Sequence, residues 1–372
     1  TFQTLQPDLT APVQSPYNVL PNINASYNNR LTPAVSDASG KYVTLPTGPA
    51  TTFSTDYTRF AYNVNSNLAY APAGYLYSQA DRTVIKGAMA LPHITPGYYI
   101  TPKISFQSNT YAATAAVTSA NPSGAAPPPQ GFTIPTFSLD SGLAFERDAA
   151  ELKGFFGRDM LLTMEPRAFY VYTPYQNQSQ TPLFDTADAG FGVSQIFSEN
   201  TFIGNDRIAD SNATTLGLTS RMIEANTGAE RANVTLAQKQ QFTGQRVGLN
   251  GTIVNPTTYS DTLGSASVRL LGNFSADLFG QYNTQLNKFV QTTAGGSWRP
   301  TQGRSLNFGY RNVWTPPTQA FGPTPATLAQ TTTDQYNVSG QWPITREVSV
   351  LGRWGYDALT TKTLNTLVAL EW

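Results

Sequence analysis

The chain has 372 residues with 23 Lys or Arg and 23 Asp or Glu, so its formal net charge is zero. A balanced charge gives no electrostatic reason to bind a polyanion, and we therefore exclude nucleic acid as a partner. Only 12% of the residues are charged and another 12% are aromatic, which is far from the composition of a typical soluble domain.

Apolar runs are short throughout the chain, and the stretch 87–92 is among the longest. A membrane-spanning helix needs about 20 consecutive apolar residues, so helical spans are excluded. Strands of a membrane β-barrel alternate between lipid-facing and lumen-facing side chains and need no such run. The absence of Cys excludes a disulfide framework and a thiolate metal site within these residues.

Alternating apolar and polar residues predict strands along the chain. The earliest clear case is 98–107, where Tyr98, Ile100, Ile104 and Phe106 share a face. The stretch 161–173 alternates in the same way. Further runs place the following residues on apolar faces: Phe274, Ala276, Leu278 and Tyr282; Leu306, Phe308 and Tyr310; Tyr336, Val338, Gly340 and Trp342; Val348, Val350, Trp354 and Tyr356; Leu364, Val368, Leu370 and Trp372. A tight hairpin is expected at 343–346.

We predict roughly fourteen to sixteen strands of about 10 residues, joined alternately by short turns and long loops. The expected fold class is all-β: an antiparallel transmembrane β-barrel of the outer-membrane type, incomplete and part of a larger barrel. The long connections are expected at 30–51, 115–130, 175–212 and 316–332. A soluble β-sandwich or solenoid would also alternate, but its outer face would carry Lys, Glu and Asp. Here that face is mostly Asn, Gln, Ser, Thr and Gly.

Catalytic chemistry has little support in the sequence. His93 is the single histidine, so a Ser-His-Asp triad or a His-ligated metal would rest on one isolated residue. We expect no enzyme activity, no cofactor and no metal.

Carboxylates gather in one long connection, which also contains Arg207. They are Asp185, Asp188, Glu199, Asp206 and Asp210. Their spacing is not that of a calcium-binding EF-hand loop, and we expect a salt-bridged loop instead.

Glu165 and Arg167 lie two positions apart on an expected strand, so both point to the same face. If the apolar partners face lipid, this is the lumen face. We expect these side chains to pair with charges on neighbouring strands or on a loop folded into the lumen, which is a structural role.

Three motifs in a fixed order carry a family resemblance: MEPRAFYVYTPY at 164–175, FIGNDRIADSN at 202–212 and TLGLTSR at 215–221. The chain resembles the LptD family of lipopolysaccharide-assembly proteins, with Met164 in place of Leu and Ser211 in place of Ala. The positions that match the family motifs are Glu165, Pro166, Arg167, Gly204, Asp206, Arg207, Asn212, Ser220 and Arg221.

This resemblance implies an outer-membrane translocon that receives lipopolysaccharide from a periplasmic bridge and inserts it into the outer leaflet. It implies as partners an LptE-like plug lipoprotein, the bridge protein LptA through an N-terminal domain, lipopolysaccharide and outer-membrane lipids. The family barrel has about 26 strands. We therefore expect residues 1–372 to be part of the barrel domain, without the periplasmic jelly roll and the terminal strands that form the lateral gate.

The long connection 175–212 is expected to fold over or into the lumen and to meet the plug or a sugar head group. The residues assigned a structural or plug-contacting role by this hypothesis are Glu165, Arg167, Asp185, Asp206, Arg207, Asp210 and Arg221.

A general porin or solute-uptake barrel is the alternative function. It would need a charged constriction, and the sequence lacks evident clusters of luminal Arg or Lys. An outer-membrane lipase or protease would need more than His93, and a secreted adhesin would be soluble without detergent.

Overall fold

The computed structural model describes residues 18–30, 35–36, 42–44, 48–61, 77–115, 130–249, 251–255, 259–270, 273–315 and 331–372. The chain forms two compact units. Unit 1 comprises Thr1–Gly142, Ala168–Thr215 and Gln240–Thr258, and unit 2 comprises Leu143–Arg167, Leu216–Lys239 and Tyr259–Trp372. The division between them falls within four long strands: β8 (Phe132–Leu143), β10 (Met160–Thr173), β13 (Ser211–Glu224) and β14 (Glu230–Gln241).

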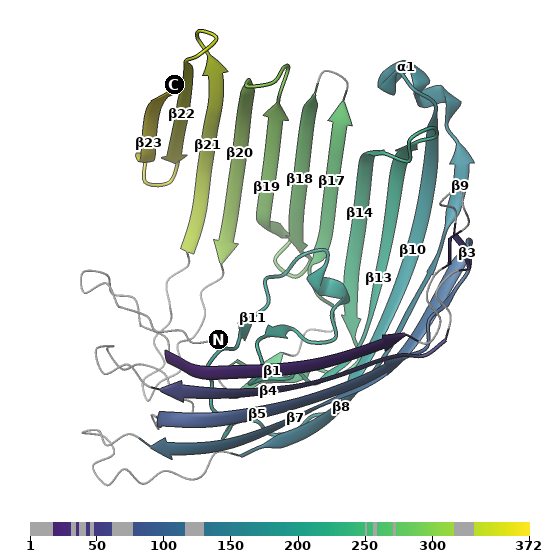
Figure 1. The fold of residues 1–372 in the computed structure, drawn as a ribbon, viewed down its shortest axis with the longest axis vertical. Helices are drawn as coiled ribbons and strands as arrows, with labels where there is room; N and C mark the ends of the chain where they lie inside the picture. The colour runs from purple at the N-terminus through teal and green to yellow at the C-terminus, as the bar shows by residue number, and fades with distance from the viewer. Residues whose placement is uncertain are drawn as a thin grey trace. The chain divides into compact units, whose positions relative to one another are not determined.

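Unit 1 is built on five long antiparallel strands in the order β1, β4, β5, β7, β8 (Figure 1). Their bounds are β1 Asn18–Arg30, β4 Ala50–Ala61, β5 Tyr77–Ala90, β7 Tyr98–Ala115 and β8 Phe132–Leu143. Three short strands accompany them: β2 Val35–Ser36, β3 Tyr42–Thr44 and β6 His93–Ile94. Residues with β-branched and aromatic side chains are frequent in these segments, as in strands generally.

The two faces of the unit 1 strands differ in what covers them. Thr58 of β4 pairs with Arg82 of β5, which pairs with Tyr111 of β7, and all three side chains are buried. On the opposite face Ile85 and Ile104 are exposed. We call the face that bears Arg82 the polar face of unit 1.

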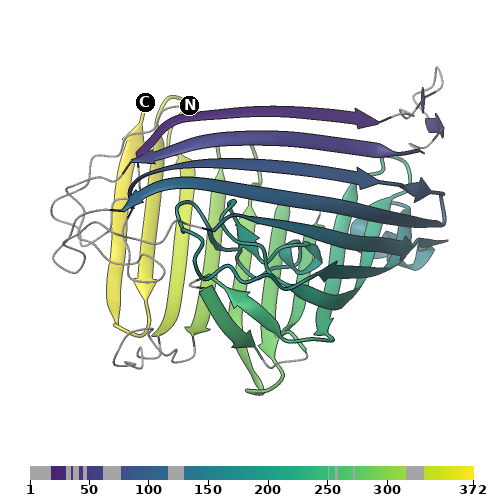
Figure 2. The same ribbon diagram turned by 90° about the horizontal axis from the view of Figure 1, so that it is seen from below.

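Residues 174–210 connect β10 to β13 and lie against one side of the unit 1 strands in both ribbon views (Figures 1 and 2). We call these residues the anchored segment. Its regular elements are short: β11 Ala187–Asp188, the 3-10 helix η3 Gln195–Phe197 and β12 Phe202–Ile203. A second hairpin of unit 1 is formed by β15 Gln245–Gly248 and β16 Gly251–Asn255.

Small apolar clusters pack the anchored segment in place. One joins Ile208 to Phe132 and Ile134 of β8. Another joins Phe202 and Ala209 to the β15–β16 hairpin, and Phe197 packs against a cluster of β10 and β13 residues. These clusters supply the apolar core of unit 1.

Unit 2 contains seven consecutive antiparallel strands from β17 to β23, with β14 beside β17 (Figure 1). Their bounds are β14 Glu230–Gln241, β17 Thr262–Leu270, β18 Phe274–Asn283, β19 Lys288–Trp298, β20 Ser305–Thr315, β21 Thr331–Pro343, β22 Ser349–Asp357 and β23 Lys362–Glu371. The unit also holds β9 Phe145–Asp148, the 3-10 helix η2 Ala150–Leu152 and the one-turn helix α1 Lys153–Phe156. No helix among the described residues has the length and apolar character of a membrane span.

Register in unit 2 separates polar from apolar side chains row by row. One row across β17 to β21 is Arg269, Ser275, Ser297, Asn307 and Ser339. A row on the other face of β17 to β22 is Val268, Ala276, Gly296, Phe308, Val338 and Trp354. Successive residues of a strand point to opposite faces, so unit 2 has a polar face and an apolar face, and its large apolar side chains are solvent-accessible.

The predicted all-β antiparallel fold is confirmed, as are the alternating faces. Fifteen described strands have nine or more residues, eight of them before β17 and seven from β17 onwards, which agrees with the expected fourteen to sixteen. The predicted hairpin at 343–346 is a slightly longer turn, closed by bonds from the Ile344 and Thr345 amides to the carbonyl of Val348. Val348 therefore precedes β22 instead of lying within it. The expected long connections at 115–130 and 316–332 lie almost wholly outside the described residues.

Candidate functional site

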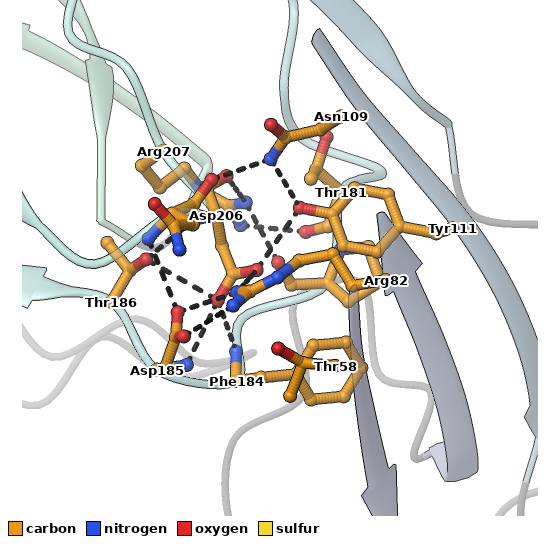
Figure 3. Close-up of polar contacts among 12 residues, drawn as sticks. Thr58, Arg82, Asn109, Tyr111, Thr181, Phe184, Asp185, Thr186, Asp206 and Arg207 are labelled. Carbon is orange, nitrogen blue, oxygen red and sulfur yellow. Dashed lines mark hydrogen bonds and ion pairs between the residues drawn. The ribbon is translucent and has the colours of Figure 1, made fainter. Parts of the chain in front are cut away.

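A buried arginine on the polar face of unit 1 is bound by two carboxylates of the anchored segment (Figure 3). Arg82 is only 1% exposed. Its Nη1 donates to Oδ1 of Asp185 and Oδ1 of Asp206, both at 2.6 Å, and its Nη2 donates to Oδ2 of Asp185 at 2.5 Å. The guanidinium also lies 4.9 Å from the ring of Phe60, which stacks on Phe184. The ion pairs of Arg82 and the stacking of Phe60 on Phe184 therefore join β4 and β5 to a segment more than a hundred residues away in sequence.

Asp206 is the most completely enclosed member of this cluster, with no exposed surface. Besides Arg82, its carboxylate accepts the backbone N–H groups of Phe184 at 2.7 Å and Asp185 at 3.0 Å, and the hydroxyl of Tyr111 at 3.1 Å. Charge-assisted bonds of this kind are stronger than neutral ones. These hydrogen bonds hold the backbone of residues 184–186 against residue 206.

The two carboxylates titrate differently. Burial opposes ionisation of Asp185, but the hydrogen bonds and charge of Arg82 outweigh it and hold the pKa of Asp185 below its ordinary value. Burial raises the pKa of Asp206; Arg82 counteracts the shift, and the neighbouring charge of Asp185 adds to it. Asp185 is thus the carboxylate that most firmly supplies the negative charge opposite Arg82.

Arg207 points away from this ion-pair cluster and binds backbone carbonyls, which corrects the expectation that it neutralises the surrounding carboxylates. It is fully buried and makes no ion pair within the described residues. Its guanidinium donates to the carbonyl oxygens of Thr181 at 2.8 Å, Asp206 at 3.0 Å, Pro182 at 3.1 Å and Leu249 at 3.2 Å. Neighbouring residues of an extended chain point in opposite directions, so Asp206 and Arg207 serve different partners.

Two further side chains replace backbone pairing in the anchored segment. Gln178, 1% exposed, donates to the carbonyl of Ile208 at 2.7 Å and accepts the Ile208 N–H at 3.0 Å. Asn200 accepts the N–H of Ala209 at 2.9 Å and donates to the carbonyl of Arg207 at 3.0 Å. Buried backbone groups must be paired, and here amide side chains provide the pairing.

Gly204 is required by the same arrangement. Its φ is +87°, and a Cβ placed there would lie 2.3 Å from the carbonyl oxygen of Asp185 and 2.8 Å from Cα of Thr186. The backbones of the two halves of the anchored segment therefore approach too closely for any other residue.

Asp210 fixes the β15–β16 hairpin. Its carboxylate accepts the N–H groups of Arg246 at 2.9 Å and Val247 at 2.8 Å, and the Arg246 guanidinium lies 3.8 Å from the ring centre of Tyr175. Nearby, Asn212 accepts a hydrogen bond from the hydroxyl of Tyr170 at 3.1 Å. Both ends of the anchored segment are thus bonded to unit 1.

A cavity of about 480 Å³, lined by both polar and apolar side chains, remains between the anchored segment and the strands β4, β5, β7 and β8. Lys86 and Lys103 line it from the strands, and Glu199 lines it from the segment. Lys103 pairs with Glu199 at 2.9 Å, Ser138 donates to Glu199 at 2.5 Å, and Lys86 donates to Oδ1 of Asn205 at 2.6 Å.

The remaining predicted residues lie in unit 2 and form strand-to-strand contacts. Arg221 lies 3.3 Å from Glu165 and 3.5 Å from Glu230, and Ser220 donates to the carbonyl of Thr163 at 2.9 Å. Pro166 and Arg167 lie on β10. Glu165 of β10 thus pairs with a charge on the neighbouring strand β13, but the sequence did not identify Arg221 as the partner.

Glu224 is a buried carboxylate of unit 2 that the sequence did not single out. Its side chain is 3% exposed and pairs with Arg158 at 3.1 Å and with Arg231. Thr227 donates to it at 2.6 Å across the β13–β14 turn. The cluster closes one end of that hairpin.

The single histidine takes no part in the ion-pair cluster around Arg82. His93 is exposed, and its nearest polar partner is the hydroxyl of Tyr98 at 3.3 Å. In the described ranges, no group of three or more Asp, Glu, His or Cys is placed to hold a metal ion. Asp188, on β11, has a pKa raised by burial.

The sequence shows no evident cluster of Arg or Lys. Four arginines that are distant in sequence nevertheless line one pocket of unit 2: Arg231, Arg269, Arg299 and Arg304. Pairing between antiparallel strands brings such residues together without any local signal.

The fold and its two-faced strands define the class: an antiparallel β-sheet protein of the outer-membrane barrel type. The family described as LPS transport system D matches residues 1–354, and the chain belongs to this LptD family of outer-membrane proteins. It is 38% identical over 339 residues to an LPS-assembly protein LptD of Cupriavidus pinatubonensis, covering 90% of this chain and 39% of the relative. It is 37% identical over 375 residues to that of Ralstonia nicotianae, covering 100% of this chain and 41% of the relative.

The chain spans about two fifths of the length of these curated relatives. Solved structures similar to it include the copper transporter OprC, with a TM-score of 0.39, 12% identity, and coverage of 93% of this chain and 60% of that one. A variant of the ferric enterobactin receptor PfeA from Pseudomonas aeruginosa gives a TM-score of 0.39 at 10% identity, with coverage of 92% and 52%. The relatives do not favour the porin alternative.

Replacing Arg82 with Gln is expected to loosen the anchored segment, because removing one partner of a buried ion pair costs about 3–5 kcal/mol. Hydrogen–deuterium exchange of the purified parent protein in detergent would show faster exchange at residues 184–206. Arg59→Gln is the matched control, since the Arg59–Asp81 pair is 43% and 29% exposed and such pairs contribute about 1 kcal/mol or less. Equal exchange in the two variants would contradict the anchoring role.

Replacing Gly204 with Ala is expected to disturb residues 185–206 more than backbone strain alone explains. Gly228→Ala separates the two effects, because Gly228 has φ +69° and nothing within 4 Å of the added Cβ. Strain of this kind costs about 1–2 kcal/mol. If Gly204→Ala destabilises its surroundings no more than Gly228→Ala does, the close approach at Asp185 is unimportant. Exchange rates around each glycine measure both effects.

Proposed function

We propose that this chain is part of a translocon that receives lipopolysaccharide from a periplasmic bridge and inserts it into the outer leaflet of the outer membrane. The family match along residues 1–354 carries this proposal. The curated relatives bear the name LPS-assembly protein LptD. The geometry described above supports it in two respects.

First, both units pair a polar strand face with an apolar one. A lipid with several acyl chains and a sugar head group needs a polar path for the head and an apolar environment for the tails. The cavity beside Lys86, Lys103 and Glu199 offers hydroxyl, amide and charged groups to such a head group.

Second, the charged residues of the site hold structure together. Arg82, Arg207 and Asp210 are all engaged in bonds that fix the anchored segment. We propose that the protein transports its substrate without making or breaking covalent bonds, and that energy comes from a partner that pushes substrate along a continuous path.

We further propose that the anchored segment meets an LptE-like plug lipoprotein in the barrel lumen. Ile203 supports this proposal, because it is apolar, 58% exposed and located on β12 of this segment. Apolar groups presented by a well-fixed backbone are typical anchors of protein interfaces. The bridge protein LptA is proposed to reach the translocon through a periplasmic jelly-roll domain of the parent protein, and residues 1–372 are proposed to be part of its barrel domain.

Depletion of the parent protein tests the transport function. Newly made lipopolysaccharide is expected to stop reaching the cell surface and to accumulate in the inner membrane or periplasm, as followed by pulse-labelling and accessibility to antibody at the cell surface. Unchanged surface lipopolysaccharide together with reduced uptake of small solutes would replace this proposal with the porin alternative.

Substitution of Ile203 with Asp tests the plug contact. Co-purification of the plug lipoprotein with the parent protein is expected to fall about 10-fold, because a charge would replace an apolar anchor at the interface. Ser194→Asp adds the same charge to another exposed position of the anchored segment and is the control. Undiminished co-purification with Ile203→Asp would refute a contact at this position.

A further inference from the structure

Four arginines line a pocket at one end of the unit 2 strands. The pocket has a volume of about 780 Å³ and is lined by Arg231 of β14, Arg269 of β17, and Arg299 and Arg304 of the β19–β20 turn. No Asp or Glu is among its lining residues, which are otherwise mainly Ser, Thr, Asn and Gln. The composition of the wall is that of a site for an anion.

Three of these charges are uncompensated. Arg231 is bound to Glu224, but Arg269, Arg299 and Arg304 make no ion pair with any carboxylate in the described part of the chain, and all three are exposed. The Arg304 guanidinium lies 5.1 Å from the ring centre of Trp342, a contact that orients it without neutralising it. Several like charges around one hollow raise the local concentration of anions.

Most residues of the pocket lie on the polar face of unit 2. Residues of the apolar face also line it, where the strands end. Arg269, Ser275 and Ser297 are paired across three strands and line the pocket. One residue along, Leu270 and Phe274 are also paired and also line it. The wall therefore offers donors beside apolar side chains, as a lipid head group requires.

The position along the strands indicates the side of the membrane. The pocket lies at the β17–β18 and β19–β20 turns, and the latter occupies only residues 299–304. At the other end of these strands, residues 316–330 separate β20 from β21, and that end also holds the short turns 284–287 and 358–361. Short turns of outer-membrane barrels are periplasmic and long loops extracellular. Trp298 and Trp342, whose rings are 6.1 Å apart at this end, mark the level of the head groups.

We infer that this pocket binds the phosphate groups on the sugar head of lipopolysaccharide on the periplasmic side of the barrel. The inference rests on the proposed function, which supplies the substrate class. Guanidinium groups bind phosphate through paired N–H donors, and the Ser, Thr, Asn and Gln side chains provide partners for sugar hydroxyls. The volume lies within the range of small-molecule sites, about 300–1,000 Å³.

Binding to the full-length parent protein in detergent, with bisphosphorylated lipid A as the probe, tests the inference. The variant is Arg269→Gln with Arg299→Gln; Arg231 is left unchanged because it holds Glu224. We expect the dissociation constant to rise about 10-fold or more, which is the loss of one strong charge-assisted contact. Binding of fully dephosphorylated lipid A should not change between the variant and the unaltered protein.

The matched control is Arg311→Gln with Arg353→Gln. Both residues lie on the polar face of unit 2, at positions paired with Gln335 and Ser339 respectively, are exposed and do not line the pocket. The control removes the same charge. Retained heat-modifiable migration on electrophoresis would establish that each double variant is folded.

Three outcomes would overturn the inference: unchanged binding in the pocket variant, equal weakening in the pocket and control variants, or an equal dependence of phosphatidylglycerol binding on the pocket arginines. The last would assign the pocket to membrane phospholipid. Because the assay uses purified components, it can fail while lipopolysaccharide export stays dependent on the parent protein. Failure of the proposed function would instead appear as export that persists after depletion.

Discussion

The buried charge of Arg82 is the constraint on which the organisation of unit 1 depends. Removing a guanidinium from water costs several kcal/mol unless its donors are satisfied. Asp185 and Asp206 accept three short hydrogen bonds from its Nη1 and Nη2 groups, and the ring of Phe60 lies 4.9 Å from the guanidinium. Both carboxylates belong to the anchored segment, so the strand residue can be buried only if that segment is in place. A polar strand face offers little apolar surface to bind a long connection, and a directional ion-pair cluster specifies its position instead.

Side-chain hydrogen bonds take the place of regular secondary structure within the anchored segment. Gln178, Asn200 and Arg207 all bond to backbone groups of residues distant in the segment. Each bond requires a particular side-chain length and geometry, and Arg207 alone serves four carbonyls. This explains why a connection with almost no strand or helix carries a dense sequence motif. The motif residues fold the segment, and the exposed positions between them remain free to contact other molecules.

The local parts of this architecture could be predicted from sequence, and the non-local parts could not. Alternation correctly placed Phe274, Leu306 and Phe308 on apolar faces, because a period of two is visible within one strand. The role of Arg82 was missed because its partners are 103 and 124 residues away. A local signal did exist: Arg82 shares its face with Ala80 and Val84, so a charge there needed a partner. Arg207 binds backbone carbonyls, although its position among several carboxylates in the sequence suggested an ion pair.

For a related reason, the net charge of the chain does not predict whether it has a local anion-binding site. The chain is neutral overall, but its positive and negative side chains are not paired evenly across the structure. Asp185 and Asp206 pair with Arg82, and Glu224 pairs with Arg158 and Arg231. These carboxylates therefore do not neutralise other cations. The arginines at the β17–β18 and β19–β20 turns of unit 2 therefore remain uncompensated among the described residues. A neutral composition excludes a strong long-range field, which falls off within about 10 Å in salt, but it places no limit on a local anion site. The expectation that the chain binds no nucleic acid rests on the charge of the whole surface and does not extend to a single phosphate group in a pocket.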